Sequence, residues 1–283
     1  MTAGCSKAPL LVAEDLGRTY GSRRAGWLGR PAAPPSPALA GASMTLRRGE
    51  ILGIVGESGS GKTTLARCLA LLERPDTGRV RLHGQDLTAL APHALRARRR
   101  AIQTIFQDPY ASLNPRLTVG SAIAEVIAVH GLAPRHAIAA RVRDLLGQVG
   151  LPPSAAQNYP ASFSGGQRQR VCIARALAAE PEVLIADEPV SSLDVSVQAQ
   201  IVNLLLDLAE RTGLAVLFIG HDLPLIDAVA PRKLVMLNGR IVETLEAGVP
   251  LVDAHHPYTR DLLAAVPTLD RPLADPSQRP SPP

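Results

Sequence analysis

The sequence predicts an α/β fold in which strands and helices alternate and a mostly helical lobe is inserted. The apolar run ILGIV at residues 51–55 leads through a glycine-rich turn into a segment of helical character. From residue 164 the pattern alternates between helix and strand, up to a final hairpin around Asn238 and Gly239. Residues 107–160 contain two apolar segments with helical spacing, which predict the inserted lobe.

The individual elements follow from local pattern in chain order. A first strand starts at residues 10–12, and its segment closes at Tyr20. Residues 21–37 are rich in Pro, Gly and Arg, which indicates an exposed loop before strand-like pattern returns at Ala38. The other expected strands are 79–83, 102–106, 183–186, 214–219, 234–237 and 240–243, and the expected helices are 62–72, 119–130, 137–149, 167–179, 195–211 and 223–229.

Composition narrows the class of protein. Apolar residues make up 46% and charged residues 19% of the 283 residues, so we expect a globular core. The net charge of +5 suits phosphate ligands, membrane headgroups or nucleic acid and does not choose among them. The N-terminus does not resemble a signal peptide, and no apolar run reaches the roughly 18 residues of a membrane span. We therefore expect any membrane role to come through a partner.

A phosphate-binding loop is the first motif that carries chemistry. Eight consecutive residues match G-x-x-x-x-G-K-[ST], and they are Gly56, Glu57, Ser58, Gly59, Ser60, Gly61, Lys62 and Thr63. Glycines let the backbone wrap a polyphosphate, and the start of the following helix directs N–H groups at it. Lys62 adds a charge for the β- and γ-phosphates, and the Thr63 hydroxyl can ligate Mg²⁺. The alternative is a glycine-rich turn without a ligand.

A pair of acids follows the apolar strand at 183–186. Asp187 is expected beside the nucleotide, where it can hold Mg²⁺ through the water shell of the ion. Glu188 is expected to point the other way along the pleat and to act as general base on the attacking water. The alternative is an ordinary strand end with solvated acids, which the upstream phosphate loop makes less attractive.

The run SFSGGQRQR at residues 162–170 resembles the signature sequence of the ABC ATPases, with Phe163 in place of the usual Leu. Its core at a helix start is a second possible anion site, formed by Ser164, Gly165, Gly166 and Gln167. The alternative is a simple N-cap for the helix that follows. In the family, this segment completes the nucleotide pocket of the opposite subunit.

Further positions fit the family pattern, and the resemblance gives each of them a role. Gln107 resembles the Q-loop glutamine, which contacts Mg²⁺ or the attacking water. Asp194 closes a segment that resembles the D-loop, and His221 resembles the switch histidine that reaches the γ-phosphate. Tyr20 resembles the aromatic that stacks on adenine, with an ordinary edge aromatic as the alternative. Thr64 completes the expected set of nucleotide contacts.

Three segments sharpen the resemblance to the oligopeptide, dipeptide and nickel importer ATPases. They are FQDPYASLNPR at 106–116, PVSSLDVSVQAQ at 189–200 and HPYTR at 256–260. Many members of that group carry a cysteine-rich C-terminal extension linked to an iron–sulfur cluster. The cysteines of this chain are Cys5, Cys68 and Cys172, and none follows Cys172, so we expect no cluster.

The resemblance implies a complete architecture and a set of partners. It implies an ABC-type P-loop ATPase core with an antiparallel β portion, over residues 10–267, with the helical lobe at about 107–175. Residues 1–9 and 268–283 would be tails, the second of them disordered. ATP and Mg²⁺ would bind, with Lys62, Gln107, Glu188 and His221 catalytic and Thr63, Gln107 and Asp187 at the metal. The partners would be a second ABC ATPase subunit, the same or paralogous, two permease subunits and an extracytoplasmic solute-binding protein.

The expected function is to power import of a small solute, most of all di- and oligopeptides, from the cytoplasmic face of the inner membrane. The alternative is a non-transport ABC-type ATPase, such as a subunit of a phosphonate-degradation complex. Repair proteins of the superfamily usually insert a long coiled coil, and translation factors usually carry two cassettes. The basic run Arg96, Arg98, Arg99 and Arg100 lacks the wide face and stacking aromatics of nucleic-acid binders, so no nucleic acid is expected.

Overall fold

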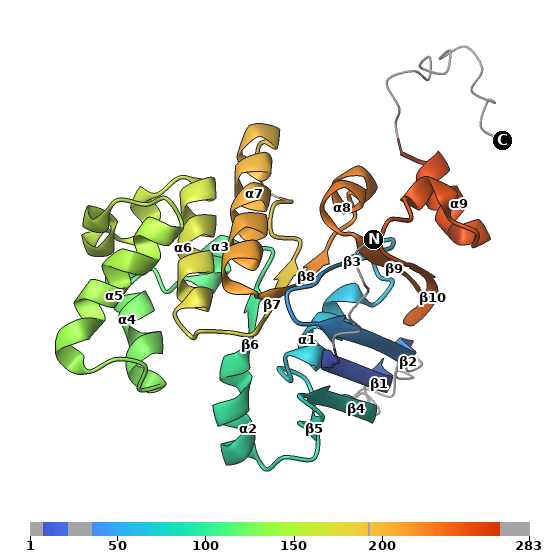
Figure 1. The fold of residues 1–283 in the computed structure, drawn as a ribbon, viewed down its shortest axis with the longest axis horizontal. Helices are drawn as coiled ribbons and strands as arrows, with labels where there is room; N and C mark the ends of the chain where they lie inside the picture. The colour runs from blue at the N-terminus through green and yellow to red at the C-terminus, as the bar shows by residue number, and fades with distance from the viewer. Residues whose placement is uncertain (1–7, 22–35, 192, 267–283) are drawn as a thin grey trace, which may run out of the picture.

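The computed structural model describes residues 8–21, 36–191 and 193–266, and these ranges form two sheets covered by helices (Figure 1). The expected C-terminal tail at 268–283 and most of the expected loop at 21–37 lie outside the described residues. Within them, no helix is both long and apolar enough to cross a bilayer.

The first sheet is the antiparallel portion that the family resemblance implied. It has the strand order β2-β1-β4-β5. Its strands are β1 (Pro9–Tyr20), β2 (Ser36–Arg47), β4 (Thr77–Leu82) and β5 (Gln85–Asp86). Both β2 and β4 pair antiparallel with β1, so Tyr20 closes the end of the central strand of this sheet.

The second sheet is mostly parallel and has the strand order β10-β9-β3-β8-β7-β6. Its strands are β3 (Ile51–Val55), β6 (Ile102–Ile105), β7 (Val183–Asp187), β8 (Ala215–Ile219), β9 (Arg232–Leu237) and β10 (Arg240–Leu245). β3, β6, β7, β8 and β9 run parallel, and β10 returns antiparallel to β9. The carboxyl ends of the parallel strands therefore meet at one edge, where α/β sheets bind their ligands.

Side chains of the parallel strands alternate between two cores, as a sheet buried on both faces requires. In β8, Ala215, Leu217 and Ile219 join the core shared with β1, β2 and α1 (Lys62–Leu69), whereas Val216 and Phe218 join the core shared with the helices. The antiparallel sheet and α1 thus lie on one face of the parallel sheet, and the helical layer lies on the other (Figure 1).

The helical lobe is also present, and its apolar core is continuous with that of the helical layer. Its helices are α3 (Pro109–Ser112), α4 (Val119–Val129), α5 (Arg135–Gln148) and α6 (Gly165–Leu177), and the other helices are α2 (Pro92–Arg98), α7 (Val195–Thr212), α8 (Leu223–Val229) and α9 (Pro257–Ala264). Short 3₁₀ turns occupy Arg99–Ala101, Pro153–Gln157, Pro160–Ser162 and Leu251–Asp253. The expected α/β class with an antiparallel portion and a helical lobe is confirmed.

Several local expectations need correction. The helix expected at 62–72 ends at Leu69, because the backbone turns into the left-handed region at Leu71, where φ is 52°. α2, α3, α9 and β5 were not expected as separate elements. Each is short, so its apolar positions do not establish a period.

Candidate active site

The carboxyl edge of the parallel sheet holds a cleft of about 590 Å³, a volume typical of small-ligand sites. The phosphate loop follows β3, Gln107 follows β6, Glu188 follows β7 and His221 follows β8. The cleft is lined by Tyr20, Ala38, Ser58, Gly59, Gly61, Lys62, Thr63, Thr64, Gln107, Glu188 and His221. The cleft therefore brings together seven of the fifteen residues proposed from sequence for nucleotide binding, together with Gln107, Glu188 and His221.

The phosphate loop is held against its neighbours so closely that two of its glycines have no substitute. Gly61 has a φ of 108°, and a Cβ there would overlap the carbonyl oxygen of Ala38. Gly56 has a φ of 155°, and a Cβ there would overlap the carbonyl oxygen of Met236. No side chain caps α1, so the first N–H groups of the helix are available to an anion in the cleft.

Lys62 spans the loop from the inside. Its Nζ donates hydrogen bonds to the carbonyl oxygens of Gly56, at 2.7 Å, and Glu57, at 2.8 Å. Burial lowers the pKa of Lys62, and the charges of Glu188, Asp187 and Glu57 oppose that shift. The ammonium is therefore preorganised beside the cleft, where a phosphate group can replace part of its contact with the loop.

Thr63 and Asp187 supply a pair of oxygen donors. Thr63 Oγ1 lies 3.4 Å from Asp187 Oδ1, and the Asp187 side chain is buried. Burial raises the pKa of Asp187, the hydrogen bond from Thr63 opposes this, and the charge of Glu188 adds to the rise. Oxygen donors of this kind fit Mg²⁺, which keeps several water ligands and takes phosphate oxygens. The described residues contain no cluster of three or more His, Cys, Asp or Glu side chains that could hold a metal by themselves.

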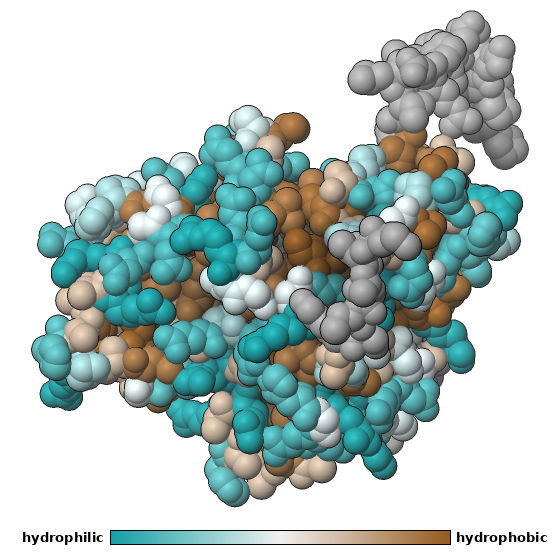
Figure 2. Space-filling model, viewed as in Figure 1, coloured by the Kyte–Doolittle hydropathy of each residue, from teal (hydrophilic) through white to brown (hydrophobic). Residues whose placement is uncertain are grey.

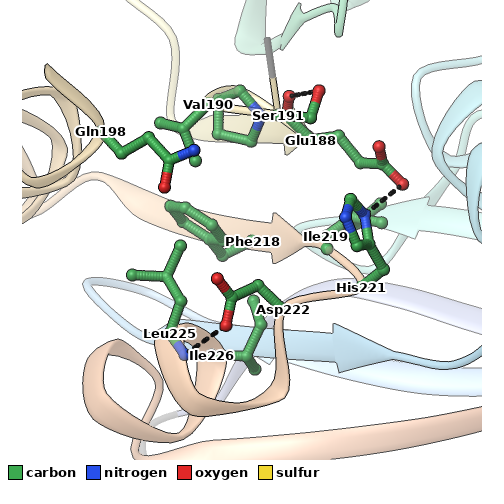
Figure 3. Close-up of a pocket in the computed structure, with 12 residues that line it drawn as sticks. Glu188, Val190, Ser191, Gln198, Phe218, Ile219, His221, Asp222, Leu225 and Ile226 are labelled. Carbon is green, nitrogen blue, oxygen red and sulfur yellow. Dashed lines mark hydrogen bonds and ion pairs between the residues drawn. The ribbon is translucent and has the colours of Figure 1, made fainter. Parts of the chain in front are cut away.

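Glu188 is held by two other residues of the cleft. Gln107 Nε2 donates to Glu188 Oε2 at 3.0 Å, and His221 Nδ1 lies 3.3 Å from Glu188 Oε1 (Figure 3). The expectation that the pleat of the strand aims Glu188 was wrong, because β7 ends at Asp187. Glu188 instead has a φ of 48°, a left-handed conformation that is uncommon for glutamate and concentrates at functional sites. Its own N–H donates to the carbonyl oxygen of Ile219 at 2.9 Å.

A small pocket of about 70 Å³, with both polar and apolar side chains in its lining, lies beside Glu188 and His221 (Figure 3). Phe218 and Leu225 line it from β8 and α8, and Gln198 lines it from α7. In the space-filling view, apolar side chains are visible in the hollow between α7 and α8 (Figure 2). Asp222 accepts a hydrogen bond from the N–H of Leu225 at 3.0 Å, which fixes the turn that carries His221.

The signature segment lies in a second cleft, of about 720 Å³. Ser164, Gly165, Gly166 and Asp194 line it, and so do Gln107 and His221, which line both clefts; none of residues 56–64 is among its lining. Ser164 caps α6: its Oγ accepts from the N–H of Gln167, and Gln167 Oε1 accepts from the N–H of Ser164. The two sequence interpretations of this segment, cap and anion site, are thus compatible.

Five residues proposed from sequence line neither of these two clefts, and they are Gly56, Glu57, Ser60, Gln167 and Asp187. Tyr20 lines the cleft, and its hydroxyl donates to the carboxylate of Glu73. Glu57 was proposed to contact nucleotide, but it lines a different cleft, beside α8 and α9. Its N–H donates to the hydroxyl of Tyr258 at 3.0 Å, a contact that sequence reasoning missed. Tyr258 belongs to the HPYTR motif at 256–260. That motif carried a family resemblance but did not indicate which residues its tyrosine would contact.

Known proteins resemble this chain in sequence and in fold. The family model described as ABC transporter matches residues 39–191. Glutathione import ATP-binding protein GsiA is 53% identical over 239 residues, both in Escherichia coli strain K12 and in Shigella boydii serotype 4 strain Sb227. The match covers 84% of this chain and 38% of each relative, so the chain spans well under half of their length.

Solved cassettes share the fold. A dimeric structure of a post-hydrolysis state of the ATP-binding cassette MJ0796, bound to ADP and Pi, has a TM-score of 0.73 at 27% identity, over 83% of this chain and 98% of that one. CbiO1 from Clostridium perfringens, part of the ABC transporter complex cbiONQ, has the same TM-score at 25% identity, over 92% of both chains. The resemblance inferred from the motifs is confirmed, and the chain belongs to the ABC transporter family.

Proposed function

We propose that this chain is the ATP-hydrolysing subunit of an importer for short peptides, attached to its permease at the cytoplasmic face of the membrane. The observation that carries the hydrolytic part is the placement of Glu188 between Gln107 and His221, in the same cleft as the phosphate loop. Import is proposed because the glutathione import proteins are similar over 84% of the chain.

The cleft suggests a division of labour. The N–H groups at the start of α1 and the Lys62 ammonium bind the β- and γ-phosphates. Glu188 accepts a proton from the attacking water. Gln107 and His221 first give up their contacts with the Glu188 carboxylate. Gln107 then contacts the water, and His221 contacts the γ-phosphate. Tyr20 offers its ring to the adenine from the end of β1.

Mg²⁺ fits beside Thr63 and Asp187, where it would neutralise charge on the β- and γ-phosphates. Thr63 would contribute its hydroxyl, Gln107 its side-chain carbonyl and Asp187 its carboxylate. Because burial raises the pKa of Asp187, an adjacent cation would also favour the ionised form that binds it.

We propose that catalysis needs two subunits. Ser164 to Gly166 line a cleft that excludes residues 56–64, so a phosphate bound by the loop of one chain would be met by the signature segment of another. The partner is a second copy or a paralogous ATPase. Two permease subunits and an extracytoplasmic solute-binding protein complete the proposed assembly.

The segment at 106–116 is the proposed docking site for the permease, because Tyr110 is 65% exposed there. The ring centroid of Tyr110 lies 3.9 Å from Arg168 Cζ, so the exposed ring stacks on the guanidinium.

Mixing two inactive variants should restore part of the activity. Ser164→Asp keeps a helix cap but directs a negative charge at the phosphate, and Lys62→Met removes the phosphate-binding charge. For two copies of this chain, random exchange should restore at most about a quarter of wild-type turnover, because half of the dimers are mixed and each has one intact site. Phosphate release before and after exchange measures this. Full turnover by a monomeric preparation would contradict the proposal, and Ser164→Asn, a neutral cap, is the matched control.

The cargo can be identified by uptake. Deleting the gene should abolish uptake of labelled short peptides. The solutes to test are glutathione, dipeptides, oligopeptides and nickel. Complementation with the wild-type gene should restore uptake, and Glu188→Gln should not. Loss of nickel uptake with intact peptide uptake would reverse the choice of cargo. Intact uptake of every solute together with lost growth on phosphonates would favour the non-transport alternative.

A further inference from the structure

The C-terminal helix α9 is fixed to strand β10 through a single carboxylate. Glu243 accepts hydrogen bonds from the N–H of His255 at 2.6 Å, the N–H of His256 at 3.1 Å and the hydroxyl of Thr259 at 2.5 Å. Burial opposes ionisation of Glu243, but these bonds outweigh it and lower its pKa. Thr259 is completely buried. The carboxylate therefore fixes where α9 begins and how it is rotated.

The other residues of the HPYTR motif fix the turn that precedes α9. His256 Nδ1 accepts from the N–H of Tyr258 at 3.2 Å, and Pro257 occupies the first helical position. Arg260 donates to the carbonyl oxygens of Ala254, at 3.2 Å, and His255, at 2.7 Å. As a result, the position of the Tyr258 ring is set by the whole motif.

The Tyr258 hydroxyl uses this fixed position to contact the phosphate loop. It accepts a hydrogen bond from the N–H of Glu57 at 3.0 Å, across 201 residues of sequence. The carbonyl oxygen of the same peptide unit is that of Gly56, which accepts from Lys62 Nζ at 2.7 Å. One peptide plane is thus held at its N–H by α9 and at its carbonyl by the phosphate-binding lysine.

The side of the loop that faces α9 borders open space. Between α8 and α9 a cleft of about 470 Å³ opens beside Gly56 and Glu57, with Leu262 and Val266 on its α9 side. Apolar packing therefore does not fill the space next to the peptide plane. Burial raises the pKa of Tyr258 above its ordinary value, so the hydroxyl that accepts from the Glu57 N–H is the neutral phenol.

We propose that Tyr258 is a positioning residue for ATP: it orients the peptide between Gly56 and Glu57, and through it the ammonium of Lys62. The proposal rests on the proposed ATP hydrolysis and adds a role for the C-terminal helix. α9 lies beside β9 and β10, on the side of the molecule away from the helical lobe (Figure 1). A movement of α9 would therefore act on the phosphate loop from the side of the molecule opposite the helical lobe.

Tyr258→Phe should weaken ATP binding without a matching loss of turnover at saturating ATP. The variant keeps the ring and removes the hydroxyl, so we expect the Kd for ATP to rise about fivefold, as for the loss of one hydrogen bond of ~1 kcal/mol. The kcat should stay within about twofold, since Lys62 keeps its charge and no group that touches the reacting atoms is removed. Amide exchange in the peptide that covers Glu57 should become faster. Tyr159→Phe is the matched control, because Tyr159 is exposed and lines neither cleft.

A second variant separates positioning from simple damage. Thr259→Val loosens α9 from Glu243 but keeps the Tyr258 hydroxyl, so it should raise the Kd in the same direction. Wild-type Kd and wild-type exchange at Glu57 in Tyr258→Phe would overturn the proposal, and so would an equal loss in Tyr159→Phe. If the wild-type protein itself neither binds nor hydrolyses ATP, the proposed function fails instead, and the two failures are distinguishable.

Discussion

Replacing Glu188 with glutamine should stop turnover and leave ATP bound. The amide keeps the size of the side chain and its contact with Gln107, but it cannot accept a proton from the attacking water. Removal of a positioned general base typically costs about 10²- to 10⁴-fold in rate. We therefore expect phosphate release to fall by at least about 10²-fold, while the Kd for ATP stays close to that of the wild type.

The same variant should accumulate in the closed, ATP-bound form if two chains enclose the nucleotide. Size-exclusion chromatography with ATP and Mg²⁺ would detect this as a larger species. Glu210→Gln makes the same chemical change at an exposed position of α7 and should leave both properties unchanged. Near-wild-type hydrolysis by Glu188→Gln would remove Glu188 from its role as base.

Replacing Lys62 with methionine should weaken binding of ATP itself. Methionine fills a similar apolar volume, so the main loss is the charge that Lys62 presents from its bonds to Gly56 and Glu57. A hydrogen bond to a charged partner is worth about 1.5–3 kcal/mol, which corresponds to a roughly 10- to 150-fold rise in the Kd for ATP. Turnover should fall further, because charge on the γ-phosphate grows in the transition state.

The control for this variant uses nucleotides instead of a second mutation. Because Lys62 faces the β- and γ-phosphates in this account, binding of AMP should change far less than binding of ATP. Calorimetric titration with both nucleotides would compare the two, and a melting curve without nucleotide would show that the variant is folded. An equal loss for AMP and ATP would indicate general damage to the loop and contradict the assigned role.

Local sequence pattern was enough to predict those elements and motifs whose signal lies within a few consecutive residues. The bounds expected for β3 and α8 match the structure, because an apolar run and a Pro-started helix are complete local signals. The phosphate loop was predictable for the same reason, because the spacing of its glycines, lysine and threonine is characteristic of loops that bind a polyphosphate. Glu188 was found as the residue after an apolar strand, whereas Gln107 and His221 came from the family resemblance; parallel strands bring all three to one edge.

What the sequence could not give were contacts between distant segments. The left-handed backbone of Glu188 is accompanied by a hydrogen bond to Ile219, which lies on the neighbouring strand. The bond between Glu57 and Tyr258 depends on how α9 is anchored to β10. Neither has a periodic signature in the chain. Both became visible only when the strands and the C-terminal helix were placed in space.

Mg²⁺-dependent ATP hydrolysis should occur in the cleft beside the phosphate loop, Asp187 and Glu188. The most direct test is phosphate release by the chain purified together with its partner subunits, measured with Mg²⁺, with EDTA and with Glu188→Gln in place of the wild type. We expect steady release by the wild type with Mg²⁺, which falls to background in EDTA and by at least about 10²-fold in Glu188→Gln. Release that persists in EDTA, or that is equal in the wild type and Glu188→Gln, would contradict it.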